Sequence, residues 1–104
     1  MSSVAVDSRA LRIETNAQGA IAVHGAITFD NATQALRAAP RAAREGKLDV
    51  DLSALTDADS VSLAVLIAWA AQAHAHGADL RYLNAPPALR NLAHLSDVQG
   101  LLGL

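Results

Sequence analysis

The 104-residue sequence contains no cysteine and only three aromatic residues, Phe29, Trp69 and Tyr82. A chain without cysteine forms neither disulfides nor thiolate metal sites, and this composition fits a reducing compartment. Hydrophobic residues make up 52% of the chain and many of them are alanine, so we expect a core of Leu, Ile, Val and Ala in which helices pack closely. A chain of this length is expected to form one domain, over residues 1–104, around a single core.

The chain also lacks an excess of basic residues. Its formal net charge is -2, and Lys and Arg are scattered along it. A protein that binds nucleic acid needs a basic face to displace counterions, so we expect no nucleic-acid partner. The first ten residues include Asp7 and have no basic start followed by an apolar run, which argues against a secretory signal. We therefore expect a cytoplasmic protein.

Residues 60–78 contain no Asp, Glu, Lys or Arg. The length of this stretch alone would allow a membrane span. It includes Ser62, Gln72, His74 and His76, however, and its many alanines contribute little to insertion. The stretch therefore favours a buried amphipathic helix, without direct membrane insertion.

Hydrophobic periodicity predicts a small α/β domain with a mixed β-sheet of about four strands and helices packed against it. Apolar residues at alternate positions are typical of strands, and apolar residues three and four positions apart are typical of helices. The segment after residue 97 stays unassigned. The predicted elements are strands at 11–13 and 21–27 joined by a turn at Gln18 and Gly19, a helix at 32–43 broken at Pro40, a strand at 48–53, a helix from about Ser60 to Gly77, a strand at 80–83 parallel to the strand at 48–53, and a helix at 89–95.

Three stretches together resemble STAS domains. They are "HGAITFD" at 24–30, "LDVDLSALTDADSVSLAVLIAW" at 48–69 and "GADLRYLNAPPALRNLAHLS" at 77–96. The first is similar to the glycine-led end of a STAS strand, the second to the strand, loop and helix signature, and the third to the strand and helix that follow. The resemblance covers about residues 19–96 and implies a STAS-like fold.

Within the family, the sequence is most similar to the small free-standing MlaB-like proteins, on the stretch "DLSALTDADSVSLAVL". This resemblance implies a non-enzymatic accessory subunit without a cofactor. Such a subunit binds and supports the ATPase of an ABC transporter that moves phospholipids and maintains outer-membrane lipid asymmetry. It would lie at the inner membrane only through that ATPase and its permease complex.

The alternative implied by the resemblance is an anti-sigma factor antagonist, which binds a serine kinase and is released when the serine at the helix start is phosphorylated. That serine is Ser60 in this sequence. The chain departs from the family pattern at Val61, where the residue is usually small, and at Ser62, where Gly is common. Both departures make the helix start bulkier and weaken the alternative.

Ser60 has two readings that are compatible. Either Asp59 or Ser60 can cap the helix by accepting a hydrogen bond from a backbone N–H. Such a cap stabilises the helix by about 1 kcal/mol. The resemblance adds a role in phosphorylation or partner contact. A phosphate on Ser60 would be repelled by Asp57 and Asp59 and would be rejected by a partner surface fitted to a hydroxyl, so it could act as a binding switch. We expect a cap that also lies in a partner-facing surface.

Catalysis and metal binding have little support. Asp57 and Asp59 could form a carboxylate pair for acid–base chemistry, but loop acids before a helix are usually caps, and no nucleophile, base and oxyanion site occur together. A hydrolase that uses Ser60 is a third hypothesis, although no nucleophile-elbow motif supports it. His74 and His76 lie two apart on a helix and point to different sides, unlike a metal-binding pair.

Trp69 completes the set of partner-interface candidates. A tryptophan at helical spacing is usually part of the core, but Trp69 is offset from the stripe of Leu63 and Ile67. An exposed tryptophan near Val61 and Val65 would be a typical interface anchor. The partner-contact candidates are therefore Ser60, Asp57, Asp59, Val61, Ser62, Val65 and Trp69.

Overall fold

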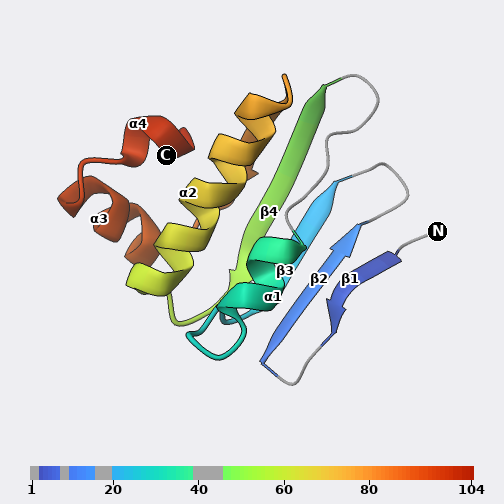
Figure 1. Cartoon of the computed structure of the whole chain (residues 1–104). Helices are drawn as coiled ribbons and strands as arrows, with labels where there is room; N and C mark the ends of the chain where they lie inside the picture. Colours follow the sequence, from blue (N-terminus) through green and yellow to red (C-terminus); the bar gives the residue numbers. More distant parts are fainter. Residues whose placement is uncertain (1–2, 8–9, 16–19, 39–45) are drawn as a thin grey trace.

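The computed structural model describes residues 3–7, 10–15, 20–38 and 46–104, which form a five-stranded sheet with helices on one of its faces (Figure 1). The strands lie in the order β1-β2-β3-β4-β5. The predicted α/β class and mixed sheet are confirmed. The sheet has one strand more than the sequence analysis assigned, because the segment before residue 10 forms the edge strand β1.

The first half of the sheet is antiparallel. β1 (Ser3–Asp7) pairs with β2 (Leu11–Thr15), and β2 pairs with β3 (Ile21–Gly25). The predicted pairing of two successive strands is confirmed for β2 and β3. The predicted turn at Gln18 and Gly19 lies outside the described residues.

The second half is parallel. β3 pairs with β4 (Lys47–Leu55), and β4 pairs with β5 (Asp79–Leu83). The connection from β3 to β4 contains α1 (Ala32–Arg37), and α2 (Ser60–Ala75) connects β4 to β5. The prediction that β4 and β5 are parallel is therefore confirmed. The rest of the predicted helix at 32–43, with its break at Pro40, lies outside the described residues.

Alternation along β4 explains why the sheet has one covered face. Leu48, Val50 and Leu52 are fully buried, whereas Lys47 and Ser53 on the opposite face are exposed. Successive strand residues point to opposite faces, so the apolar set packs under the helices and the polar set faces solvent. The same alternation in β2 and β3 continues this division across the sheet.

The helices end where the sequence indicates. Gly77 adopts a φ of 75°, and its N–H donates to the carbonyl of His74 at 3.0 Å, which closes the last turn of α2. α3 (Pro87–Leu95) has Pro87 at its first position, where no backbone N–H is needed. α4 (Gln99–Leu102) is a single turn in the C-terminal segment, for which the sequence predicts no element. No helix in the described ranges is long and apolar enough to cross a membrane.

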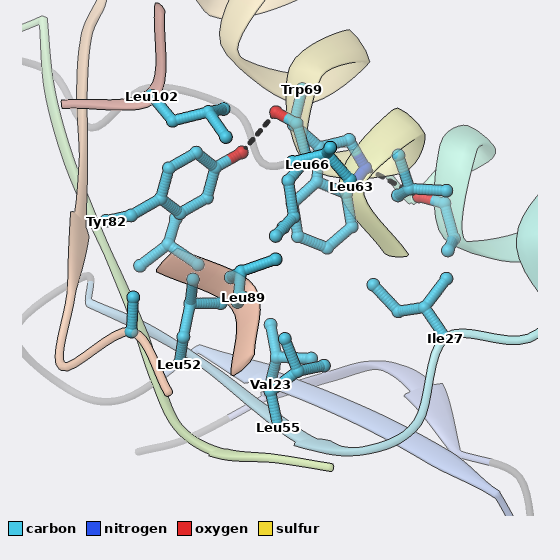
Figure 2. Close-up of a cluster of buried hydrophobic side chains, with 14 of the residues drawn as sticks. Val23, Ile27, Leu52, Leu55, Leu63, Leu66, Trp69, Tyr82, Leu89 and Leu102 are labelled. Carbon is cyan, nitrogen blue, oxygen red and sulfur yellow. Dashed lines mark hydrogen bonds between the residues drawn. The ribbon is translucent and has the colours of Figure 1, made fainter. Parts of the chain in front are cut away.

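The core lies between α2, α3 and the sheet (Figure 2). Tyr82 of β5 donates its hydroxyl proton to the carbonyl oxygen of Leu66 in α2 at 2.6 Å, so its ring is buried without an unpaired polar atom. Aliphatic side chains from both layers fill the space around this pair. The largest fully buried side chains are Trp69, Leu11, Ile13, Ile27, Leu48, Leu52, Leu66, Leu89, Val23, Val50 and Ser62.

Gly25 ends β3 at a position that a side chain would not tolerate. Its φ is 93°, and a Cβ there would collide with the carbonyl oxygen of Ala10. Its own carbonyl oxygen accepts a hydrogen bond from the N–H of Thr56 at 2.8 Å, which joins the ends of β3 and β4. The strand predicted at 21–27 therefore stops at Gly25, although Ile27 in the loop beyond it is fully buried.

Candidate functional site

Asp59 and Ser62 cap the N-terminus of α2. Asp59 has an extended backbone, and its Oδ1 accepts a hydrogen bond from the N–H of Ser62 at 2.9 Å. The Ser62 hydroxyl lies 3.5 Å from the N–H of Asp59 and completes a reciprocal capping box. The expected cap is confirmed for Asp59 and is wrong for Ser60, which is the first helical residue. Ser60 is left exposed, and no other described residue forms a hydrogen bond with its hydroxyl.

Ser62 is fully buried and therefore cannot contact a partner directly. Its hydroxyl lies 3.2 Å from the carbonyl oxygen of Ile27, to which it can donate, and 3.2 Å from Oδ1 of Asp59. These contacts join the first turn of α2 to the loop between β3 and α1. The prediction of Ser62 as an interface residue is wrong, because this hydroxyl fixes the site from inside.

Trp69 is also buried, with 1% of its surface exposed, and the interface prediction for it is wrong. Its Nε1 donates a hydrogen bond to the carbonyl oxygen of Ala35 in α1 at 2.9 Å (Figure 2). This bond satisfies both the indole N–H and a carbonyl in the last turn of a short helix. Trp69 therefore holds α1 against α2.

The loop at 26–31 presents the most exposed large apolar side chain of the described residues, Phe29, which is 87% exposed. The buried side chain of Asn31 holds this loop from both sides. Its Oδ1 accepts from the N–H of Thr28 at 2.8 Å, and its Nδ2 donates to the carbonyl oxygen of Ala26 at 3.0 Å. The phenyl ring is therefore displayed on a loop that the Asn31 side chain braces on both sides of Ile27.

A groove of about 470 Å³ lies between this loop, α1 and the first half of α2. None of the residues that line it is charged, and most are apolar. Ser60 lies at its edge and Val61 is partly exposed along it, while Val65 forms part of its wall although only 2% of its surface is exposed. The lining residues are Phe29, Ala32, Thr33, Leu36, Ser60, Val61, Ala64, Val65 and Ala68.

Three carboxylates belong to the loops beside this groove. Asp30 follows Phe29 in the β3–α1 loop, and Asp57 and Asp59 precede α2 in the β4–α2 loop. All three are exposed. Asp57 has a φ of 51°, a left-handed conformation that Asp tolerates better than most residues. The two loops meet at the carboxyl ends of the parallel strands β3 and β4, so the carboxylates give this end of the groove a negative charge.

The arrangement offers a contact surface more than a reaction centre. Oδ1 of Asp59 is occupied by the helix cap, and no described His or carboxylate forms a hydrogen bond with Ser60. His74 and His76 lie exposed at the far end of α2. Among the described residues, no three His, Asp or Glu side chains come close enough together to hold a metal ion.

The residues of this surface that no sequence pattern indicated are Phe29, Ala32, Thr33, Leu36, Ala64 and Ala68. Leu36 is 43% exposed on α1, and Ala64 and Ala68 follow Ser60 and Val61 along α2. The usable signal was Phe29 itself, an aromatic residue between Thr28 and Asp30 in a polar loop. Exposed apolar side chains that gather in one patch mark interaction sites, and Phe29 and Leu36 line the same groove.

A profile of the family described as "Mlab, STAS domain" matches residues 11–103, which is nearly the whole chain. A search of curated proteins found no match.

Proposed function

Because the chain belongs to the MlaB-type family of STAS domains, we propose that it is a non-enzymatic accessory subunit of a phospholipid-transporting ABC transporter. It binds the cytoplasmic ATPase subunit, which joins the permease in one complex, and it supports the assembled and active form of the ATPase. The protein reaches the inner membrane only through this complex, and the lipid does not touch it.

The observation that carries this proposal is the uncharged groove beside Ser60. Phe29 and Leu36 are exposed apolar side chains that border the groove, and a monomer in water gains nothing from displaying them. Aromatic side chains surrounded by small contacts are common anchors of protein interfaces. The surface therefore fits a protein partner better than a small polar substrate.

A second candidate function is an anti-sigma factor antagonist that is released from a serine kinase on phosphorylation. Ser60 favours it, because the hydroxyl is exposed at the first position of α2 and is not used in the cap. A phosphate there would lie close in sequence to the carboxylates of Asp57 and Asp59 and would add charge at the edge of an apolar groove. Both candidates use the same surface and differ in the partner.

An affinity pull-down from the native cells separates the two candidates. The tagged wild type is compared with Ser60→Glu and with Ser96→Glu, a matched change at an exposed serine after α3. We expect an ABC ATPase and its permease with the wild type and with Ser96→Glu, and their loss with Ser60→Glu. Recovery of a serine kinase without any transporter subunit contradicts the transporter role and supports the second candidate.

A further inference from the structure

Carboxylates lie beside one end of the groove between α1 and α2. At the loop end lie the exposed carboxylates of Asp30, Asp57 and Asp59, on two loops that the bond between Thr56 and Gly25 holds together. At the other end α1 finishes with Arg37, which is exposed. The lining between the two ends carries no charge. An occupant that fits must therefore be apolar along its length and positive where it meets the loops.

The shape of the groove also restricts the occupant. Ala32 of α1 and Ala64 and Ala68 of α2 contribute only methyl groups to its lining. Small side chains allow the backbone of a partner to approach closely, so that larger apolar side chains of the partner can fill the space. Phe29 and Leu36 stand at the border as exposed walls. This is the arrangement in which an amphipathic helix places its apolar face in a hydrophobic groove.

We propose that the groove receives an amphipathic helix of the partner protein, with its apolar side chains beside Phe29 and with Lys or Arg next to Asp30 and Asp57. The inference rests on the proposed function in one respect, that this surface is where the partner docks. The apolar contact supplies affinity, and the carboxylates select the orientation and raise the association rate.

Photo-crosslinking in the native cells identifies the occupant. A photoreactive phenylalanine derivative replaces Phe29, and the matched control carries it at Leu95, which is 82% exposed on α3. We expect the crosslinked peptide from position 29 to be an amphipathic helical segment with Lys or Arg at one end, and this segment to be missing at position 95. A crosslink to a second copy of this chain, to a lipid or to a segment without basic residues overturns the proposal, as does the same yield at both positions.

The contribution of the carboxylates to binding is then measured with a synthetic peptide of the crosslinked segment. Its Kd is determined for the wild type, for Asp30→Asn with Asp57→Asn, and for Asp97→Asn. Asp57 and Asp97 have similar positive φ values, 51° and 58°, which Asn also adopts readily, so Asp97→Asn is a matched control outside the groove lining. We expect the double variant to bind about tenfold more weakly at low salt, with a smaller difference at high salt. Equal binding by the wild type and the double variant overturns the proposal.

The pull-down and the crosslinking experiment together distinguish failure of this inference from failure of the proposed function. Recovery of the ATPase by the wild type, together with a crosslink outside any basic helix, leaves the function standing and overturns the inference. A crosslink from position 29 to a basic amphipathic helix of a protein that is no transporter ATPase has the opposite meaning. It supports the occupant proposed here and contradicts the transporter role.

Discussion

The hydroxyl of Ser62 lies 3.2 Å from the carbonyl oxygen of Ile27, and both residues are fully buried although 35 positions separate them in the sequence. This contact joins the first turn of α2 to the loop that carries Phe29. The same serine completes the capping box with Asp59. One buried side chain therefore takes part both in the cap of α2 and in the contact between α2 and the loop that carries Phe29.

Replacing Ser62 with alanine is expected to destabilise the protein by about 1–3 kcal/mol, because the Ile27 carbonyl loses a buried donor and the capping box loses one of its bonds. The measurement is urea unfolding followed by circular dichroism. Ser60→Ala is the matched control, and it should change the free energy of unfolding by less than about 0.5 kcal/mol, since that hydroxyl is exposed and outside the cap. A larger loss from Ser60→Ala than from Ser62→Ala would contradict this assignment of the cap.

Gly25→Ala is expected to destabilise the protein by more than about 2 kcal/mol. Alanine would be strained at a φ of 93°, and its Cβ would collide with the carbonyl oxygen of Ala10. Gly100→Ala serves as the control, because Gly100 lies in α4 with open space around it and alanine favours a helix by about 1 kcal/mol. Thermal unfolding should show a lowered midpoint for the first variant and an unchanged or raised midpoint for the second. Equal midpoints for the two variants would show that the close approach at Gly25 is not rigid.

Sequence patterns predicted the parts of the fold that bury one regular face. β4 alternates between apolar and polar residues from Lys47 to Ser53, and α3 has leucines at helical spacing, so both elements could be predicted from periodicity. β1 and α4 could not be predicted from periodicity. β1 is a short edge strand held by its pairing with β2, and α4 is one turn with Gly100 inside it, held by burial of Leu102. Such short elements depend on tertiary contacts more than on their own pattern.

The site was harder to predict for a related reason. α2 is apolar on nearly every side, so its pattern does not distinguish the buried Trp69 from the partly exposed Val61. Which side faces the groove depends on where α1 packs, and the Trp69–Ala35 hydrogen bond sets that position. The exposure of Phe29 depends in turn on the hydrogen bonds of Asn31, a contact pattern that no spacing in the sequence indicates.

Asp51 lies on the solvent-facing side of the sheet, and its carboxylate is expected to make the free energy of unfolding fall in acid. The pKa of Asp51 lies below its ordinary value of 3.8, chiefly because its carboxylate accepts a hydrogen bond from the N–H of Ser53 and, further, because it accepts one from the Asn84 side chain. A lowered folded-state pKa gives stability that is present above 3.8 and is lost as the pH falls through the folded-state value. Urea midpoints measured from neutral to acid pH should therefore drop less steeply for Asp51→Asn than for the wild type. Parallel profiles would contradict this role.

At the other end of the pH scale, Tyr82 makes the core sensitive to alkali. Burial raises its pKa well above the ordinary value of 10.0, and its hydroxyl donates to the Leu66 carbonyl at 2.6 Å. A raised folded-state pKa means that its contribution to stability is complete below the unfolded-state pKa and decreases as the pH rises above it. Tyr82 is the single tyrosine of the chain, so phenolate absorbance reports on this residue alone. The absorbance should rise only together with loss of the helical circular dichroism signal, and in Tyr82→Phe the alkaline loss of stability should be weaker. A phenolate signal near pH 10 with the helices intact would place the hydroxyl in contact with water and contradict the buried bond to Leu66.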